Sequence, residues 1–261
     1  MIHLSGSGVV ADWRSSEFLG KQNPKIWSDV SDIEEITTRP DGELHRNVDK
    51  IIQEAARKHG DKLKTAIVCP PDIYGKGHGP GKTTTVYFST FLDEIKTVGS
   101  PFYGNKGTNT RSWVHIEDLM QIYAKLVEAA AAGGGNADWG VEVRPSENHF
   151  LSLLCADIQS QGYYLGASQE HSQIDVAKKT GEILAKHGLI AQDKAAPVQL
   201  PVDRINEMMQ SYNFPGIGTY MFAANSRTRA ERAQETFGYE PRAPGLWEVI
   251  EAEVLAAAGK A

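Results

Sequence analysis

The chain has 261 residues and a formal net charge of −6, with no run of Lys or Arg. That length suits one large domain or a domain with a small lobe, and the charge argues against nucleic-acid and acidic-membrane partners, which bind clustered cations. No apolar stretch reaches the roughly 18 residues of a membrane span, and the first residues lack the pattern of a signal peptide, so we expect a cytoplasmic protein.

Cysteine and histidine usage predicts neither a disulfide nor a metal site. The two cysteines, Cys69 and Cys155, are expected to be free thiols because nothing in the sequence indicates an oxidising compartment. The eight histidines form no cluster with cysteine at the spacing of metal ligands.

The first part of the chain predicts two strands separated by a loop and a helix. Residues 2–4 predict a short strand that ends in the small-residue turn Ser5-Gly6-Ser7-Gly8. Residues 12–42 predict a long loop with at most short helices. Apolar positions at helical spacing predict a helix over residues 43–59, before a strand at residues 65–69. This order indicates a parallel sheet with right-handed crossovers.

The strand at residues 65–69 runs into Pro70 and Pro71, which cannot continue a sheet ladder, so the chain must turn outward there. In open parallel sheets, ligands bind outside the carboxyl ends of the strands. The rigid pair followed by Asp72 and Tyr74 therefore indicates a partly polar rim of a binding site. A strand that ends in an ordinary turn is the alternative interpretation.

A glycine-rich loop follows, with the sequence Gly75-Lys76-Gly77-His78-Gly79-Pro80-Gly81-Lys82-Thr83. It approaches the phosphate loop Gly-x-x-x-x-Gly-Lys-Ser/Thr, but the spacing fails by one, and Pro80 lacks an N–H that would bind phosphate. We expect a flexible loop and rank a nucleotide triphosphatase third among the functions considered.

The rest of the chain alternates between helical and extended patterns. Helices are predicted at residues 86–98, 118–132 and 172–187, within 197–212, and at 225–237 and 246–258. Extended segments are predicted at residues 101–104, 111–115, 162–165 and 220–222. Residues 141–161 fit neither period.

Five short motifs occur in the order in which one known family has them. They are Leu4-Ser5-Gly6-Ser7; Arg46-Asn47-Val48-Asp49-Lys50, where Lys50 matches Tyr-x-x-x-Lys and Arg46 replaces the Tyr; Cys69-Pro70-Pro71-Asp72-Ile73-Tyr74-Gly75, against Arg-Pro-x-Asn-x-Tyr-Gly; Arg111, Val114, His115, Asp118 and Leu119, against Arg-x-x-Val-His-x-x-Asp-Leu; and Phe237-Gly238-Tyr239-Glu240-Pro241, against Leu-Gly-Trp-x-Pro. Together they resemble the extended short-chain dehydrogenase/reductase family of NAD(P)-dependent sugar epimerases, dehydratases and reductases. The resemblance covers residues 2–249 but lacks the family's first half.

That resemblance implies an α/β fold, with a partial Rossmann-type doubly wound parallel sheet and a small C-terminal α/β substrate lobe. It places the C-terminal half of an NAD(P)-binding domain at residues 1–135, and the substrate lobe with the C-terminal helices at residues 136–261. Residues 141–161 stand where the family passes directly from Trp-Gly to Gly-Tyr-Tyr, so we predict an insert there. We hypothesise that the insert is translated intron and that the start codon is internal.

The resemblance also implies the site residues. Catalytic roles fall to Ser7, Arg46 and Lys50, cofactor contacts to Ser5, Lys50, Pro70, Pro71 and Ile73, and substrate contacts to Asp72, Tyr74 and Arg111. In the family the Tyr hydroxyl is the general acid/base and the Ser polarises the substrate oxygen. Arg46 could bind an anion but could not cycle a proton. The adjacent His45 titrates near neutrality, but neighbours on a helix point about 100° apart, so it is a poor substitute. The alternative interpretation is that Arg46 and His45 are solvated side chains on the first turn of the helix and have no catalytic role.

The function implied is that of an NAD(P)-dependent oxidoreductase or epimerase-like protein acting on a small carbonyl or hydroxyl substrate. We expect a truncated protein whose activity is in question, because NAD or NADP could be held only if the missing half were supplied. The alternative is a catalytically silent dinucleotide- or ligand-binding regulatory protein of the same fold. We expect the protein to bind a small-molecule substrate and to bind neither nucleic acid nor a membrane. The sequence does not decide whether it forms a homodimer.

Overall fold

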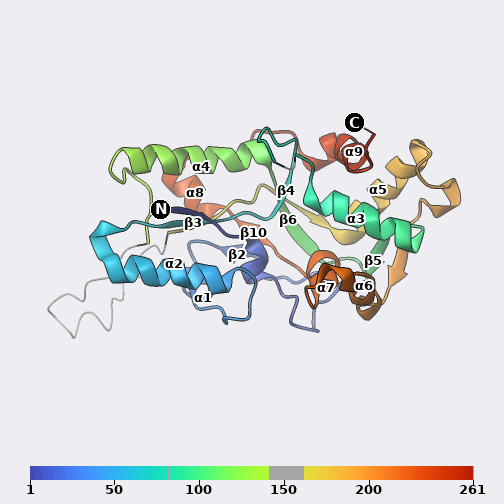
Figure 1. Ribbon diagram of the computed structural model, residues 1–261, viewed down its shortest axis with the longest axis horizontal. Helices are drawn as coiled ribbons and strands as arrows, with labels where there is room; N and C mark the ends of the chain where they lie inside the picture. The colour runs from blue at the N-terminus through green and yellow to red at the C-terminus, as the bar shows by residue number, and fades with distance from the viewer. Residues whose placement is uncertain (82, 141–161, 261) are drawn as a thin grey trace.

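Two groups of helices and strands lie along one long molecule, each around its own core (Figure 1). The computed structural model describes residues 1–81, 83–140 and 162–260. None of the helices in these ranges is long and apolar enough to cross a membrane. The α/β fold with parallel strands that the sequence predicts is confirmed.

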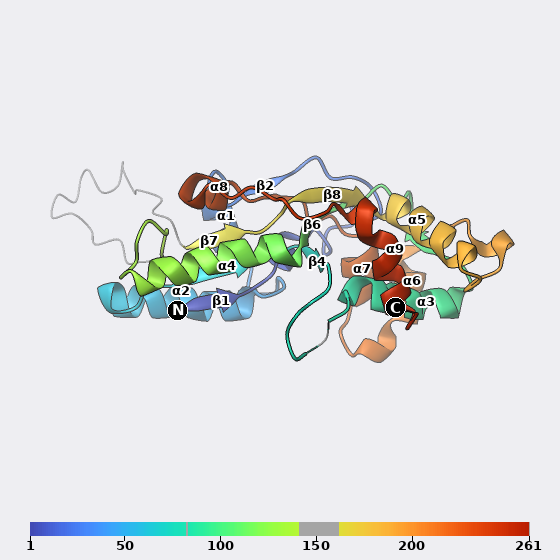
Figure 2. The ribbon, with the colours of Figure 1, turned by 90° about the horizontal axis from the view of Figure 1, so that it is seen from above.

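The first sheet consists of β1 (Ile2–Leu4), β3 (Ala66–Cys69) and β7 (Tyr163–Leu165), with β3 in the middle and all strands parallel. Alternate side chains of β3 point to opposite faces of the sheet. Ala66 and Val68 pack with α4 (Ile116–Ala131). Ile67 and Cys69 pack with α2 (Arg46–His59) and α1 (Ile33–Thr37). Helices therefore cover both faces, as a doubly wound sheet requires (Figures 1 and 2).

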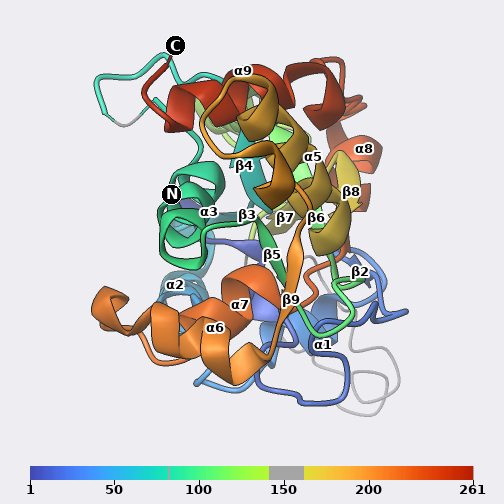
Figure 3. The same cartoon turned by 90° about the vertical axis from the view of Figure 1, so that its right-hand side faces the viewer.

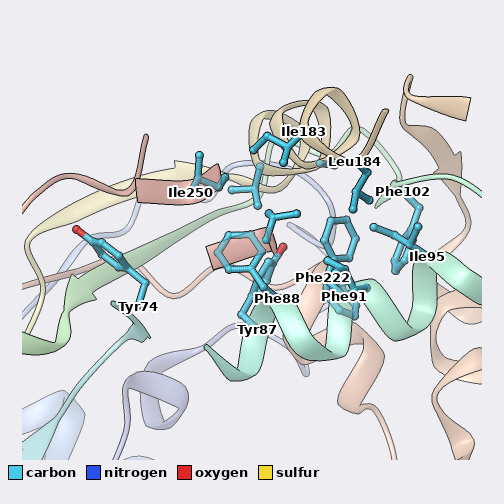
Figure 4. Close-up of a cluster of buried hydrophobic side chains, with 14 of the residues drawn as sticks. Tyr74, Tyr87, Phe88, Phe91, Ile95, Phe102, Ile183, Leu184, Phe222 and Ile250 are labelled. Carbon is cyan, nitrogen blue, oxygen red and sulfur yellow. The ribbon is translucent and has the colours of Figure 1, made fainter. Parts of the chain in front are cut away.

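The second group surrounds a cluster of aromatic rings (Figure 4). Phe91, Phe102 and Phe222 meet with ring centroids 5.1 to 5.4 Å apart. The cluster is enclosed by α3 (Val86–Val98), α5 (Gln173–Lys186), α6 (Val202–Met208), α7 (Ile217–Phe222) and α9 (Leu246–Ala257). Two parallel strands, β5 (Phe102–Gly104) and β9 (Val198–Leu200), run between α5 and α9 on one side and α6 and α7 on the other (Figure 3).

Two further sheets join these groups. One contains β4 (Asp72–Tyr74), β6 (Thr110–His115) and β8 (Gln169–Ser172), where β6 is parallel to β4 and antiparallel to β8. The other pairs β2 (Trp27–Ser28) with β10 (Thr228–Arg229), just before α8 (Glu231–Phe237). After residue 135 the chain returns to the first group, because β7 pairs with β3 in the first sheet. The domain boundary predicted between residues 135 and 136 stays a prediction.

Two predicted elements differ from the structure. Residues 220–222, predicted as extended, end helix α7, because Gly216 at φ 81 starts a helical turn and Phe222 joins the aromatic cluster. The helix predicted from residue 225 begins only at Glu231. The Asn225 side chain instead holds the loop at residues 12–21, by donating hydrogen bonds to Asp12 and to the carbonyl oxygens of Phe18 and Lys21.

The predicted insert at residues 141–161, and Cys155 within it, lie outside the described residues; Cys69 is a buried free thiol, as predicted. The residues on either side of the insert meet beside β3. Gly140 N donates to Thr65 O at 2.8 Å, and Ile67 N donates to Gly162 O at 2.7 Å. A Cβ on Gly162 would stand 2.5 Å from Gly140 N. The two residues that the family pattern would join are therefore neighbours in space.

Candidate functional site

The ends of β1 and β3 lie side by side where the sequence predicts a site. Ser5 N donates to Val68 O at 2.8 Å, and Ser7 N donates to Pro70 O at 2.9 Å. These bonds extend the parallel pairing of the two strands into the turns that follow them. The structure therefore brings the predicted residues Ser5, Ser7 and Pro70 together at the carboxyl edge of the sheet.

Ser7 begins a short 3-10 helix, Ser7–Val10, and is only 2% exposed. The Ser226 hydroxyl lies 2.9 Å from Ser7 Oγ and 3.0 Å from Ser7 O. Ser226 stands in the loop before β10, so a distant segment of the chain orients the Ser7 side chain and covers it.

Helix α2 directs the predicted residues Arg46 and Lys50 elsewhere. Arg46 Nε donates to Arg39 O at 2.9 Å, and its Nη1 donates to Gln53 Oε1 at 2.5 Å. Lys50 Nζ donates to Asp41 Oδ2 at 2.9 Å on the outside of the helix. None of these bonds reaches the strand ends. The roles predicted for Arg46 and Lys50 therefore stay predictions to which the observed contacts add no support.

The residues one position earlier, His45 and Asp49, face β1 instead. Asp49 is fully buried, accepts a hydrogen bond from Ser5 Oγ at 2.8 Å, and has His3 Nε2 3.6 Å from its other oxygen. The His45 imidazole lies over Gly6, where a Cβ would stand 2.6 Å from Nε2. His45 stands just before the helix and Asp49 lies in its first turn, and both side chains approach the end of β1. The sequence pattern makes His45 a poor substitute for the Tyr, and that prediction stays untested, but the His45 ring does lie at the end of β1.

The backbone of His45 explains where its ring lies. His45 precedes the first helical residue and has φ 65, a left-handed conformation that is uncommon outside glycine. Its carbonyl oxygen still accepts hydrogen bonds from Val48 N and Asp49 N, both at 3.0 Å. A residue held this way costs roughly 1–3 kcal/mol, and such residues cluster at functional sites. Here the conformation carries the imidazole across to the end of β1.

Burial sets the protonation of this pair. Desolvation lowers the pKa of His45 below its ordinary value of 6.5, against the attraction of Asp49 and with a smaller lowering from His3. Desolvation also raises the pKa of Asp49, although the Ser5 hydrogen bond opposes that change. The His45 residue nevertheless remains exposed to solvent. The lowered pKa favours the neutral imidazole at neutral pH, and this is the state that can accept a proton.

A cavity of about 500 Å³ adjoins the rim that follows β3. The predicted residues Pro71, Asp72, Ile73 and Arg111 line it, together with residues from the start of α3 and from α7. Since Pro71 directly follows Pro70, the cavity begins next to the strand ends. Tyr74 lies outside its lining; the Tyr74 hydroxyl donates to Pro244 O at 2.8 Å and anchors the segment before α9.

Asp72 and Arg111 form a two-point ion pair in the cavity wall. Arg111 Nε donates to Asp72 Oδ2 at 2.6 Å, and Nη2 donates to Oδ1 at 3.1 Å. Within the described ranges, no group of three or more His, Cys, Asp or Glu side chains could hold a metal ion.

Sequence reasoning considered His45 but set it aside as a poor substitute, and it missed Asp49 and Ser226. His45 and Asp49 have the same spacing as Arg46 and Lys50. The local sequence does not show which of these two pairs faces the strand. Ser226 gives no signal at all, because it reaches Ser7 from 219 residues away.

Comparisons with known proteins show what the chain is similar to. A sequence model of the NAD dependent epimerase/dehydratase family matches residues 5–141. The oxidase ucsJ of Acremonium sp. is 23% identical over 260 residues, covering 98% of this chain and 67% of that protein.

Solved structures share the fold at low sequence identity. The dTDP-glucose 4,6-dehydratase DesIV of Streptomyces venezuelae, solved with NAD bound, aligns with 97% of this chain at a TM-score of 0.53 and 13% identity. A human epimerase family protein solved with NADPH also aligns with 97% of this chain, at a TM-score of 0.55 and 16% identity. This chain spans 58% and 64% of the lengths of those two proteins.

Proposed function

The chain belongs to the NAD-dependent epimerase/dehydratase family, and from that premise we propose that it is an NAD(P)-linked oxidoreductase or epimerase-like protein acting on a small carbonyl or hydroxyl substrate. The observation that carries the proposal is the His45 imidazole, held over Gly6 at the joined ends of β1 and β3. Ligands of open parallel α/β sheets bind at such strand ends.

The strand ends fit a nicotinamide cofactor in part. Pro71 and Ile73 line the adjoining cavity, whereas the His45 imidazole occupies the space over Gly6. Ser5 and Ser7, by contrast, are 6% and 2% exposed, so a ligand reaches them only if the covering segments move. When bound, the dinucleotide would supply or accept a hydride. The cofactor contacts of Ser5, Lys50 and Pro70, and the choice between NAD and NADP, stay predictions.

His45 is the residue to which we assign proton transfer. Reduction of a carbonyl requires a proton on its oxygen, and oxidation of an alcohol releases one. A neutral imidazole accepts that proton, and the buried Asp49 carboxylate, one helical turn away, favours the imidazolium that results. Arg46 is not needed for this chemistry, which a permanently charged guanidinium could not perform.

Turnover tests the proposal, and any turnover by the full chain would reject the expectation that NAD or NADP is held only when the missing half is supplied. The full chain is mixed with NADH or NADPH and a panel of ketones and aldehydes, and oxidation of the cofactor is followed by its absorbance. We expect His45→Asn to lower kcat by roughly 10²- to 10⁴-fold, the range for loss of a general acid or base, with cofactor affinity within about twofold of the unchanged protein. His59→Asn, at the exposed end of the same helix, is the matched control. Turnover that survives His45→Asn would reject the assignment.

The alternative of a catalytically silent binding protein relied on Arg46 in the place of the tyrosine. Because Arg46 bonds to Arg39 and Gln53, that replacement says little about the chemistry of the strand ends. Cofactor binding without oxidation across the whole panel would favour the silent protein.

A further inference from the structure

The cavity next to the strand ends has an apolar wall. It lies between the rim after β3, the first residues of α3, and α7. The aliphatic side chains that line it are Ile73, Val86, Ile116, Ile217 and Met221, and the rings of Tyr87 and Tyr220 add to them. A volume of about 500 Å³ falls in the range of pockets for small organic molecules. Burial of an apolar ligand surface would therefore be the main source of affinity.

The charges in the wall cancel. Among the described lining residues, Arg111 is the one cation and Asp72 the one anion. Arg111 is 4% exposed, and three of its N–H groups are already used: two on Asp72, and one on Tyr220 O at 2.8 Å. Its guanidinium carbon also lies 4.7 Å from the centre of the Tyr220 ring. An anion that approached Arg111 would meet the Asp72 carboxylate as well, and a buried charge without a partner is costly.

Hydroxyl groups line the side of the cavity near the glycine-rich loop. Thr83 and Thr84 are exposed or half-exposed there, whereas the hydroxyl of Thr85 is bonded to Glu253. A substrate with a single carbonyl or hydroxyl oxygen could be oriented by such groups without any counter-charge.

We propose that this cavity binds an uncharged, mainly apolar carbonyl or hydroxyl compound, and that it does not bind a nucleoside diphosphate or its sugar ester. The inference rests on the proposed function for the reaction itself, but the recognition that it describes can be measured without turnover. It distinguishes this chain from a dehydratase of dTDP-glucose, whose substrate carries a diphosphate.

Binding to the full chain tests the inference, with acetophenone as the apolar probe and UDP as the diphosphate probe, each followed by titration calorimetry. We expect saturable binding of acetophenone and none of UDP. Ile217→Ala should weaken acetophenone binding roughly tenfold, through the loss of apolar contact. Val86→Ala provides a second variant that does not disturb the core, because Val86 is 60% exposed, and it should weaken binding in the same direction. Val127→Ala, exposed on α4 outside the cavity, should have no effect.

The outcomes separate this inference from the proposed function. Saturable UDP binding that is lost in Arg111→Met would overturn the inference even if NAD(P)-linked turnover were found. Failure of both probes to bind, or acetophenone binding that ignores Ile217→Ala and Val86→Ala, would overturn it too. Acetophenone binding without any cofactor oxidation would support the inference and count against the proposed function.

Discussion

Replacement of Gly6 by alanine isolates the contribution of the His45 position. An alanine Cβ at residue 6 would stand 2.6 Å from His45 Nε2, whereas ordinary contacts begin at 3.4 Å. The imidazole must therefore retreat by about 0.8 Å. Gly6 itself has φ −166, an extended conformation open to any residue, so the substitution adds no backbone strain.

The fold and the chemistry should respond very differently. The atoms displaced are the far end of a single side chain, so we expect the free energy of unfolding to fall by less than about 1 kcal/mol. A displacement of about 1 Å in a reacting group can cost roughly a hundredfold in rate, and we expect a loss of that order in kcat. The pKa of His45, lowered by desolvation in the unchanged protein, should rise towards 6.5 as the ring moves into water.

Three measurements check this prediction: urea denaturation, turnover with the carbonyl panel, and titration of the His45 ring protons by NMR. Gly79→Ala is the control, because a Cβ at that position meets nothing within 4 Å. Unchanged turnover in Gly6→Ala, with an NMR spectrum showing that the His45 ring has moved, would refute the reasoning.

The remaining predictions concern a lysine, a buried carboxylate and the insert. Lys50→Ala removes only an exposed ion pair with Asp41, so turnover should change less than about twofold. A large loss of turnover in the same assay would show that Lys50 does contribute to the site. Burial raises the pKa of Asp29 from 3.8 to about 6, so the folded state binds this proton more tightly. The free energy of unfolding should then fall by up to about 3 kcal/mol as the pH rises from about 4 to about 6, and Asp29→Asn should flatten that fall in urea titrations; an equal slope in both proteins would contradict this. Deletion of residues 141–161, with a Gly-Ser link from Gly140 to Gly162, should raise the free energy of unfolding by about 1–2 kcal/mol, because a shorter connection then joins two residues that are already neighbours; a destabilised variant would contradict this.

The sequence was sufficient for the elements whose pattern is local. Pro70 and Pro71 after an apolar run predict the end of β3. The apolar residues of α2, α3 and α4 recur at helical spacing because one face of each helix is buried, and this spacing predicts those helices. The same logic predicts that Ser7 and Pro70 meet, since parallel strands bring their carboxyl ends to one edge.

Register and distant contacts could not be predicted in the same way. The left-handed conformation of His45 begins α2 so that Asp49 is the residue turned toward β1, and a shift of one residue exchanges the helix face without changing the spacing. Ser226 and Asn225 form hydrogen bonds with segments some 200 residues away. Gly216 starts the helix α7, whose last residues are predicted to be extended from their composition. Each depends on tertiary packing that no local window contains.

Hydride transfer is the most direct test of the central claim that this chain performs nicotinamide chemistry with His45 at the ends of β1 and β3. The full chain is incubated with acetophenone and NADPH or NADH deuterated on the nicotinamide ring, and the alcohol product is analysed by mass spectrometry. The account predicts deuterium on the carbinol carbon of the product, with roughly a hundredfold less product from His45→Asn. No deuterated product from a protein that binds both compounds, or equal product from His45→Asn, would contradict it.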